Sequence, residues 1–429
     1  MGSQGALGIR STADQHEPEE IPGLPPNVAA VGAGHYCSFA ATAEGQLWSW
    51  GRNAEGQLGR ALAETEFGCS ATPQPVDALG RQQVVAAAGS GVASLALCRD
   101  GSLFSFGSSK RGQLGLGPGV RHTTDPQQLH LPAAAQQVSA GWGHAAALLE
   151  DGSLWTWGWP ASGRLGHSFA ALAEDEAELR LMDRCCWEPR RVDALQGVRM
   201  KQVVCGFDHT MVLAEDGTLF TFGDASLGQL GRPAQKQGEH MAPRFAHSWA
   251  VNPEIDCGRR MKFRRIAAGL GHCLGVLFDG GVASWGWNSA GQLGLGQFVT
   301  DECVHRPTPI YGIPSNKHAL LAAGRVHSLL ATDEQTGPYP LHSTSGGGSS
   351  SSNSNCSGSS SEAAERGRRG ASMVTMVLSW GSSANGRLGN NLYESSAIPE
   401  LVPDLDGEEV LQLACGLDHT LVLIKCQPD

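Results

Sequence analysis

The sequence predicts an all-β fold, a seven-bladed β-propeller whose closing blade is shared by the N- and C-termini. The 57 glycines and 22 prolines among 429 residues give a turn-dense composition, which is typical of short strands joined by tight loops. One pattern also recurs along the chain, and each copy is a set of short strands too small to fold alone. We therefore expect a single domain, residues 1–429, built by stacking repeats.

The repeating unit is an apolar strand, Gly-x-x-His, a second apolar strand, Asp-Gly, a strand that ends in Trp-Gly or Phe-Gly, and a Gly-Gln-Leu-Gly tail. Apolar and polar residues alternate within 209–214 and 217–223, which is the period of a half-buried strand. The Asp216-Gly217 pair between these runs predicts a type I′ hairpin turn, because that turn needs positive φ at both central residues. Each unit is thus a small antiparallel sheet, and radial closure of such sheets protects their edges.

The number of units follows from the Gly-x-x-His element, which begins at seven positions: Gly32, Gly89, Gly141, Gly206, Gly269, Gly324 and Gly416. Six strands carry the aromatic-Gly pair, at Trp50, Phe106, Trp157, Phe222, Trp285 and Trp380. Because Gly5-Ala-Leu-Gly8 looks like a worn tail, we expect residues 1–30 and 408–429 to share the closing blade. That blade lacks an aromatic-Gly strand, so either it is thin or Met1 is not the first residue of the protein.

The repeated histidines and tryptophans are interpreted as structural. The histidines are His35, His144, His209, His272, His327 and His419, and the tryptophans are Trp50, Trp157, Trp285 and Trp380. A residue present once per blade does what each blade needs, such as bonding a neighbouring backbone group, whereas an active site on a pseudo-symmetric ring must break the symmetry. A catalytic or metal role for these histidines is the alternative. Val92 is the exception in the second unit.

No motif of a known catalytic or phosphate-binding site is present in the sequence. We therefore expect no enzyme activity with bond chemistry, no catalytic residue, no cofactor and no metal. Cys205 and Cys415 occupy a repeat slot that alanine fills in other units, so they are predicted to be small core residues rather than metal ligands or disulfide partners.

Charge and hydropathy limit the kinds of partner. The net charge is −11, and the pI is about 5.7, so nucleic acid is an unlikely main partner. The sequence contains no run of about 18 apolar residues, so it predicts no membrane-spanning helix. We expect a soluble, intracellular monomer in the cytoplasm, the nucleus or both, with a protein as its partner.

Three insertions interrupt the repeats. Residues 337–372 form a Ser/Gly-rich insertion in one hairpin, which is predicted to be disordered because it has no apolar periodicity. Its end, 366–372, resembles a site for a basophilic kinase, although a basic flank of a loop is the simpler interpretation. The acidic segment 168–188 and the segment 232–265 are long loops, which on rigid scaffolds often carry function.

The candidate partner-binding residues are those that differ between units. After the aromatic-Gly pair come Trp159, Asp224 and Trp287 in slots where other units have small or polar residues, and Trp142 lies inside one Gly-x-x-His element. Large aromatic and charged residues are common in interface hot spots. Arg259 and Arg260 join this set from a basic run. The alternative for each tryptophan is packing against its own hairpin.

The segment 284–296, Ser-Trp-Gly-Trp-Asn-Ser-Ala-Gly-Gln-Leu-Gly-Leu-Gly, resembles the signature of the regulator of chromosome condensation family, and the likeness covers nearly the whole chain. The resemblance implies a propeller that binds a protein, with guanine-nucleotide exchange on a small GTPase as one activity, since the namesake of the family acts on the GTPase Ran. No segment here matches the exchange wedge of that protein. Its basic tail is absent too, because residues 1–27 contain a single basic residue, Arg10.

The repeat is also similar to that of plant ultraviolet-B photoreceptors, so a tryptophan-based light receptor is the alternative function. Those receptors cluster tryptophans by means of Gly-Trp-Arg-His-Thr motifs in successive blades. Here Gly141-Trp142-Gly-His144 alone approaches that motif.

Overall fold

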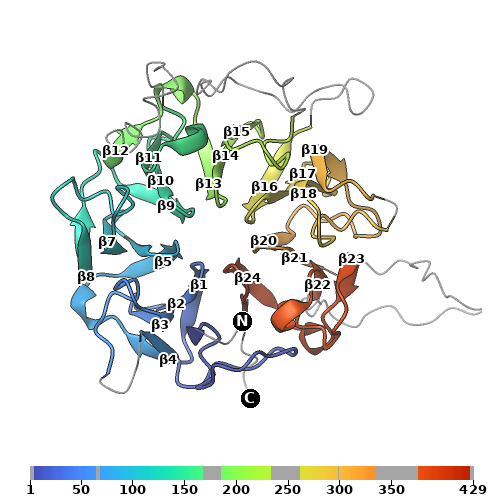
Figure 1. Cartoon of the computed structure of the whole chain (residues 1–429), viewed down its shortest axis with the longest axis horizontal. Helices are drawn as coiled ribbons and strands as arrows, with labels where there is room; N and C mark the ends of the chain where they lie inside the picture. The colour runs from blue at the N-terminus through green and yellow to red at the C-terminus, as the bar shows by residue number, and fades with distance from the viewer. Residues whose placement is uncertain are drawn as a thin grey trace, which may run out of the picture.

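The computed structural model describes residues 4–63, 68–167, 185–232, 261–297, 299–333 and 375–425. These residues form antiparallel sheets that radiate around a central axis, so the protein is an all-β propeller (Figure 1). The first strand of each sheet lies nearest the axis, and the later strands lie progressively farther out.

The first three sheets have four strands each. The first sheet contains β1 (Val28–Ala33), β2 (Cys37–Thr42), β3 (Leu47–Arg52) and β4 (Cys69–Pro75). The second contains β5 (Val84–Gly89), β6 (Ala93–Cys98), β7 (Leu103–Ser108) and β8 (His122–Leu129). The third contains β9 (Ala135–Ala140), β10 (His144–Leu149), β11 (Leu154–Gly158) and β12 (Cys186–Arg191).

The remaining sheets vary in width. The fourth contains β13 (Met200–Cys205), β14 (His209–Ala214) and β15 (Leu219–Gly223). The fifth contains β16 (Phe263–Ala268), β17 (His272–Leu277), β18 (Val282–Trp287) and β19 (Cys303–Pro309). The sixth contains β20 (Leu320–Ala323), β21 (His327–Asp333), β22 (Thr375–Gly381) and β23 (Ser396–Leu401). The seventh contains β24 (Val410–Cys415) and β25 (Thr420–Ile424).

Short 3-10 turns occur between strands. They are η2 (Asp77–Leu79), η3 (Ala161–Gly163), η4 (Asp193–Leu195), η5 (Ala384–Gly386) and η6 (Pro403–Leu405). Leu79, Leu195 and Leu405 are buried, so each of these three turns inserts one leucine into the core between sheets.

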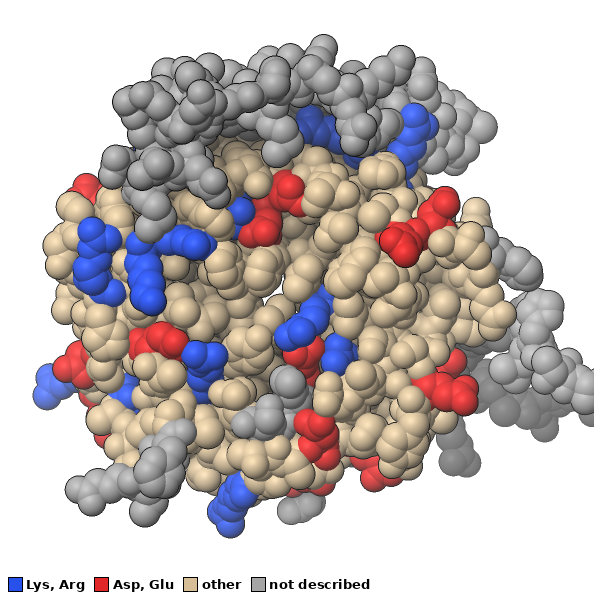
Figure 2. All heavy atoms as spheres, in the orientation of Figure 1, with Lys and Arg blue, Asp and Glu red and all other residues tan. Residues whose placement is uncertain are grey.

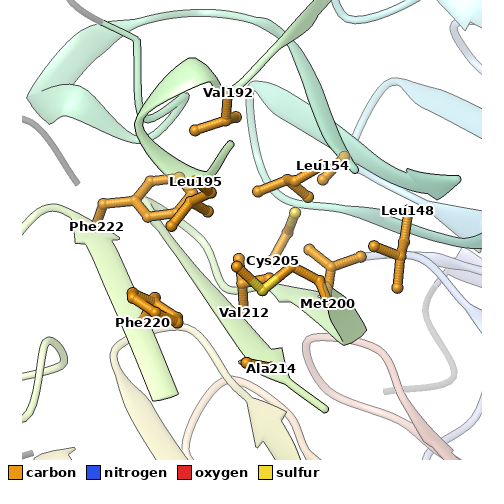
Figure 3. Close-up of a cluster of buried hydrophobic side chains, with 12 residues drawn as sticks. Leu148, Leu154, Val192, Leu195, Met200, Cys205, Val212, Ala214, Phe220 and Phe222 are labelled. Carbon is orange, nitrogen blue, oxygen red and sulfur yellow. The ribbon is translucent and has the colours of Figure 1, made fainter. Parts of the chain in front are cut away.

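The core consists of the layers between neighbouring sheets. Between the third and fourth sheets, Leu148 and Leu154 pack with Met200, Val212 and Phe222 (Figure 3). Second strands have such layers on both faces, so every residue of β2, β6, β10 and β14 is buried. The expected half-buried alternation within 209–214 was therefore wrong, because β14 is covered on both faces and apolar residues occur on both of them.

The two cysteines predicted to be core residues lie in inner strands. Cys205 belongs to the cluster of Figure 3, and burial raises the pKa of its thiol to about 12. Cys415 ends β24 beside the sixth sheet, and burial raises its pKa to about 12 as well. Both are free thiols. A thiol with so high a pKa stays protonated and is a poor nucleophile at neutral pH.

The hairpin turns are not of the predicted type. Gly217 has φ of 84°, but Asp216 is not among the residues with positive φ, so a type I′ turn is excluded. The chain instead makes a three-residue loop closed by Gly217 N–H to Ala214 O, with the glycine in the left-handed region. The Asp216 carboxylate accepts a hydrogen bond from the Thr218 amide at 2.8 Å. The aspartate therefore stabilises the loop through its side chain, and the glycine supplies the one residue with left-handed backbone.

Each tail joins two neighbouring blades. In the fifth sheet, Ser284 donates to the carbonyl of the tail residue Leu293 at 2.7 Å, which fixes the tail to its own blade. The carbonyl of the preceding residue, Gln292, accepts from Trp380 Nε1 at 2.9 Å and from Ser328 Oγ at 2.8 Å, both in the next sheet. One peptide carbonyl therefore binds two donors of the neighbouring blade. The same tryptophan contact recurs as Trp50 to Ala6, Trp157 to Gln113 and Trp285 to Gln229.

A second set of contacts, the histidine ring, links the start of each second strand to the next blade. The slot lies opposite the glycine of the aromatic strand, as in the pair His144 and Gly158. Around the propeller it holds Cys37, Ala93, His144, His209, His272, His327 and His419. His272 Nε2 lies 2.9 Å from Ser328 Oγ. Because that hydroxyl donates to Gln292 O, the histidine must carry the proton on Nε2.

The predicted position of the repeated histidine slot was wrong in the first two units. Cys37, rather than His35, pairs with Gly51 and occupies the first slot, while Ala93, rather than Val92, occupies the second. His35 therefore lies two residues earlier, in the loop before the strand. The Gly-x-x-His spacing at Gly32 arises because Gly34 is the true counterpart of the repeated glycine, as its bond to Cys37 O at 2.8 Å shows.

The histidine ring has one gap, and both partners change there together. His144, His209, His272, His327 and His419 each contact the residue after the next slot, and Cys37 bonds Ser94. At the remaining junction Ala93 faces the blade that carries Ala145, and both alanines are buried. Because both polar partners are replaced, no buried donor or acceptor is left without a hydrogen bond, so the missing contact costs little stability.

The first and last sheets lie side by side (Figure 1). The Gln412 side chain of β24 accepts from the Val31 amide and donates to the Val31 carbonyl of β1, both at 2.9 Å. Within the described residues six sheets have three or four strands and the last has two, and no N-terminal strand pairs with it. Seven blades with a closing blade shared by both termini therefore stay a prediction.

Several sequence predictions fall outside the described residues. These are the insertion at 337–372 with its kinase-type end, the acidic segment from 168 to 184, and the residues between 233 and 260.

The histidine ring predicts a steep loss of stability in acid. Burial lowers the pKa of His209 to about 4 and those of His272 and His419 to about 3, and it holds those of His144 and His327 well below 6.5. The unfolded chain binds more protons than the folded one as pH falls below 6.5, so the free energy of unfolding should fall by up to about 1.4 kcal/mol per pH unit for each histidine.

Urea unfolding of the whole chain between pH 7 and 4.5 measures this slope. The variant His272→Gln should be less stable at pH 7 but should lose about 1.4 kcal/mol per pH unit of the acid dependence. An unchanged slope in the variant would show that acid sensitivity has another source.

Candidate functional site

The positions that break the repeat symmetry gather at one end of the propeller, around the mouth of its central hollow. The residue that follows each repeated glycine lies in the loop before the second strand, and four of these residues, His35, Phe207, Leu270 and Leu417, line a hollow of about 70 Å³. Figure 2 shows the central hollow on the face toward the viewer, with basic side chains gathered at its left, over β7 and β8. Leucine stands at this loop position in two blades and a different residue stands there in each of the others, so the mouth of the hollow is asymmetric.

An aromatic–arginine cluster, comprising Arg111, Trp142, Trp159, Arg164, Phe207 and Asp208, lies beside this hollow. The ring centroids of Trp142 and Trp159 are 5.6 Å apart, and Trp142 stacks on Phe207 at 5.3 Å. The Arg111 guanidinium lies 3.8 Å from the Trp159 ring and 4.8 Å from the Trp142 ring. Such cation–π contacts typically contribute about 0.5–2 kcal/mol each. The cluster therefore fixes side chains from three blades against one another.

Local structure explains the positions of the two tryptophans. Trp159 directly follows β11, and its amide donates to Gly143 O at 2.8 Å, which holds it against the loop that carries Trp142. The Trp142 amide donates to Phe207 O at 3.1 Å, so this loop is also tied to the fourth sheet. Both side chains are partly exposed. The indole N–H of Trp159 is buried and has no hydrogen-bond partner among the described residues.

Arg164 and Asp208 form an ion pair beneath the tryptophans. The Arg164 side chain is 2% exposed and the Asp208 side chain 32%, and the Arg164 guanidinium lies 4.6 Å from the centroid of the Trp159 ring. Burial raises the pKa of Asp208, more than the neighbouring Arg164 lowers it, and burial likewise lowers the pKa of Arg164. The Arg164 Nε also donates to Ala161 O at 2.8 Å. This arginine is therefore part of the scaffold, while Arg111 is the more accessible cation.

The other predicted site residues lie in different surroundings. Asp224 accepts from Gln229 Nε2 at 2.8 Å, and its charge affects the pKa of both Arg164 and Asp208, so it borders the cluster. Trp287 is the last residue of β18 in the fifth sheet, where its amide donates to Gly271 O at 2.8 Å. In the described part of the chain no aromatic or cation contact joins Trp287 to the cluster. Arg259 and Arg260 lie outside the described residues.

Four residues of the cluster were not predicted as site residues: Arg111, Arg164, Phe207 and Asp208. A signal for two of them was present: the tail has arginine in place of glutamine at Arg164, and the loop of the next blade has aspartate at Asp208. The same paired exchange occurs at Arg387 and Asp418, which lie 3.1 Å apart. In both cases an arginine that replaces the tail glutamine pairs with an aspartate in the loop before the second strand of the next blade.

The site has the chemistry of a recognition surface. Partly exposed tryptophan and arginine side chains beside the half-buried Arg164–Asp208 ion pair have the composition typical of protein-interaction hot spots. Among the residues described, no group of three or more His, Cys, Asp or Glu side chains is placed to hold a metal ion. Nor does the described part of the chain contain a helix long and apolar enough to cross a membrane.

Family models match nearly the whole chain. The RCC1-like domain matches residues 1–364, and the regulator of chromosome condensation (RCC1) repeat matches residues 376–423.

Three curated relatives are 27–30% identical to this chain over the aligned residues. It is 29% identical to the ultraviolet-B receptor UVR8 of Arabidopsis thaliana over 77% of this chain and 69% of the receptor. It is 30% identical to protein RCC2 of Mus musculus over 90% of this chain and 65% of RCC2. It is 27% identical to the E3 ubiquitin-protein ligase HERC2 of Homo sapiens over 92% of this chain, which corresponds to 7% of the ligase.

Solved structures show the same fold. Prp20p of Saccharomyces cerevisiae superposes with a TM-score of 0.73 at 20% identity, over 100% of this chain and 91% of that chain. Human WBSCR16 superposes with a TM-score of 0.69 at 20% identity, over 99% and 96% of the two chains. With family models matching throughout and the propeller fold shared, the chain belongs to the family of RCC1-like domains built from regulator of chromosome condensation repeats.

Proposed function

We propose that this chain is a non-enzymatic protein-binding propeller that presents the aromatic–arginine cluster to a protein partner. The observation that carries the proposal is the junction of the second, third and fourth sheets, where Arg111, Trp142 and Trp159 form a rigid, partly exposed group. Trp287 occupies the slot of Trp159 in the fifth sheet, but it makes no contact with a second tryptophan or an arginine among the described residues, so the combination is particular to this junction.

We further propose a small GTPase as the partner class and nucleotide exchange as the activity. The family resemblance supports this, and the yeast structural relative Prp20p is described by its binding to Gsp1p and histones. An exchange factor needs no bond chemistry, only contacts that favour the nucleotide-free GTPase, which suits a site without catalytic residues. The net charge of −11 favours a protein over nucleic acid. Action as a monomer in the cytoplasm or nucleus is part of this proposal.

The architecture that goes with this function is a seven-bladed ring closed by both termini. Its support is the N-terminal Gly5-Ala-Leu-Gly8 segment, in which the Ala6 carbonyl accepts from Trp50 Nε1 at 2.9 Å and from Ser38 Oγ at 2.7 Å. These are the contacts that the tail of one blade makes with the next. We assign this segment as the tail of the blade formed by β24 and β25.

Substitution of Trp159 by alanine should separate binding from folding. It removes a partly exposed ring with two arginine contacts and should cost about 1 kcal/mol of stability. The matched control Trp285→Ala removes a fully buried ring and should cost about 3–5 kcal/mol. With Ran loaded with a fluorescent GDP analogue, the wild-type chain should accelerate nucleotide release, and Trp159→Ala should reduce the rate about tenfold.

Thermal melts of each variant accompany the exchange assay. If Trp159→Ala melts as low as Trp285→Ala, the ring is a core residue and the cluster is not the interface. If wild-type chain neither binds nor accelerates Ran, the GTPase is the wrong partner class, whereas equal activity of wild type and Trp159→Ala would place the interface elsewhere.

The contact of two tryptophans with one arginine also favours a second candidate, a tryptophan-based ultraviolet-B receptor. Its support is the 5.6 Å pair Trp142 and Trp159 with Arg111 against both rings. Under this candidate, ultraviolet-B irradiation of the purified chain should change its elution volume on a sizing column, and Trp159→Phe should abolish the change. An elution volume that is the same before and after irradiation would eliminate this function.

A further inference from the structure

The loop that joins β7 to β8, residues 109–121, carries three cations and no carboxylate: Lys110, Arg111 and Arg121. Figure 2 shows basic side chains gathered over β7 and β8, the two strands that this loop joins. Lys110 and Arg121 are exposed, and Arg111 is partly exposed. Because the whole chain has a net charge of −11, this segment, called the basic loop below, is a local exception in an acidic protein.

The three cations of the basic loop have no anionic partner in the described part of the chain. Their side chains form no ion pair there and donate no hydrogen bond to a described residue. Other exposed cations do pair, as Arg199 does with Glu215 at 3.1 Å and Lys425 with Glu409 at 2.9 Å. Like charges on one loop repel one another, so the basic loop favours an anion from outside the chain.

Backbone contacts hold the basic loop in place and bring its cations together. The Ser109 amide donates to Arg121 O at 2.8 Å, so the two ends of the loop meet and Lys110 lies next to Arg121. Farther along, the Gly117 amide donates to Trp187 O at 2.9 Å, which fixes the loop to β12 of the third sheet. The loop is therefore a preformed surface, and a partner need not spend binding free energy on ordering it.

Aromatic rings of the third sheet hold both guanidinium groups of the basic loop. The Arg121 guanidinium lies 3.8 Å from the centroid of the Trp187 ring, and the Arg111 guanidinium lies 3.8 Å from that of the Trp159 ring. A guanidinium that stacks on a ring through its flat face keeps the N–H groups along its edge available. Two parallel N–H groups of that edge match the two oxygens of a carboxylate. The loop thus presents two planar donors in fixed positions, with an ammonium group beside one of them.

We propose that the basic loop binds an acidic segment of a protein partner, whose carboxylates pair with the guanidinium groups of Arg111 and Arg121 and with the Lys110 ammonium. Three cations neutralise too few phosphates to hold a nucleic acid against the net charge of −11, whereas they suit a short run of Asp and Glu. The proposal rests on the proposed function, because it names the chemistry of the partner on the same face. It extends the binding surface from the aromatic–arginine cluster outward to Arg121 and Trp187.

The first experiment measures the binding of two fluorescein-labelled peptides to the whole chain by fluorescence anisotropy. The acidic probe has alternating glutamate and glycine residues, and in the neutral control glutamine replaces every glutamate. The acidic probe should bind saturably and at least about tenfold more tightly than the control, and added salt should reduce the difference. Equal binding of the two peptides, or no binding of the acidic one, would overturn the proposal. Because the assay contains no GTPase, a chain that is inactive on Ran can still pass it.

The second experiment changes one exposed side chain of the basic loop. Arg121→Glu should weaken binding of the acidic probe about tenfold, because it replaces a cation by an anion. Arg121→Lys should weaken it about threefold, because the charge remains but the planar pair of donors is lost. The matched control Arg81→Glu makes the same charge change at an exposed residue before β5, at the opposite end of the propeller, and should bind like the wild type. Equal losses in Arg81→Glu and Arg121→Glu would assign binding to net charge and contradict the proposal.

Three other results would identify a different occupant of the basic loop, and each would contradict the proposal. A thymidine oligonucleotide that binds more tightly than the acidic probe would show a nucleic-acid surface. A wild-type dimer that Arg121→Glu dissociates would show that a second copy binds there. If the wild-type chain binds no probe but a variant with amides at four acidic positions does, the chain itself occupies the loop; these positions are Glu174, Asp175, Glu176 and Glu178.

Discussion

The architecture depends on one contact, in which the carbonyl of a tail accepts one or two hydrogen bonds from side chains of the next blade. A four-stranded sheet of this size cannot bury its apolar faces by itself, so each blade must pack against its neighbours to stay folded. The carbonyl of Gln292 shows how: it is fixed to its own blade through Leu293 and bound from the other side by Trp380 and Ser328. These hydrogen bonds fix the position of each sheet relative to the next, and the apolar layers pack around them.

The histidine ring extends this constraint around the propeller. A buried hydroxyl that donates to the tail carbonyl still has lone pairs to satisfy, and the histidine of the preceding blade donates to one of them, as at Thr210 and His144. At one junction the chain changes both partners of this network to alanine, at Ala93 and Ala145. At the junction where His144 contacts Thr210 it keeps both partners, and it exchanges the tail glutamine and the loop residue for Arg164 and Asp208. The second exchange places the buried Arg164 guanidinium against Trp159, so the candidate site lies where the chain departs from the repeat pattern.

Repetition made much of the fold predictable from the sequence, because an error in one unit is corrected by the others. The buried tryptophan at Trp285 and the core cysteine at Cys205 were recognisable from their slots. His35 was misassigned because spacing alone cannot show that Gly34 is the true repeat glycine, and the turn at Asp216 was misassigned because Asp-Gly suits two turn types. Of the site, Trp142 and Trp159 were found as exceptions to the repeat, whereas Arg111 and Phe207 were not, because contacts across blades depend on three-dimensional closure.

The most direct test of this account is a double-mutant cycle at the junction of the first and last sheets, where His419 Nε2 lies 2.9 Å from Ser38 Oγ. His419→Ala, Ser38→Ala and the double variant reproduce the alanine pair that the chain itself uses at another junction. If inter-blade polar contacts hold the ring closed, the double variant should lose about 1–2 kcal/mol less stability than the sum of the single variants, measured by urea unfolding at pH 7. Losses that add to within about 0.3 kcal/mol would contradict the account.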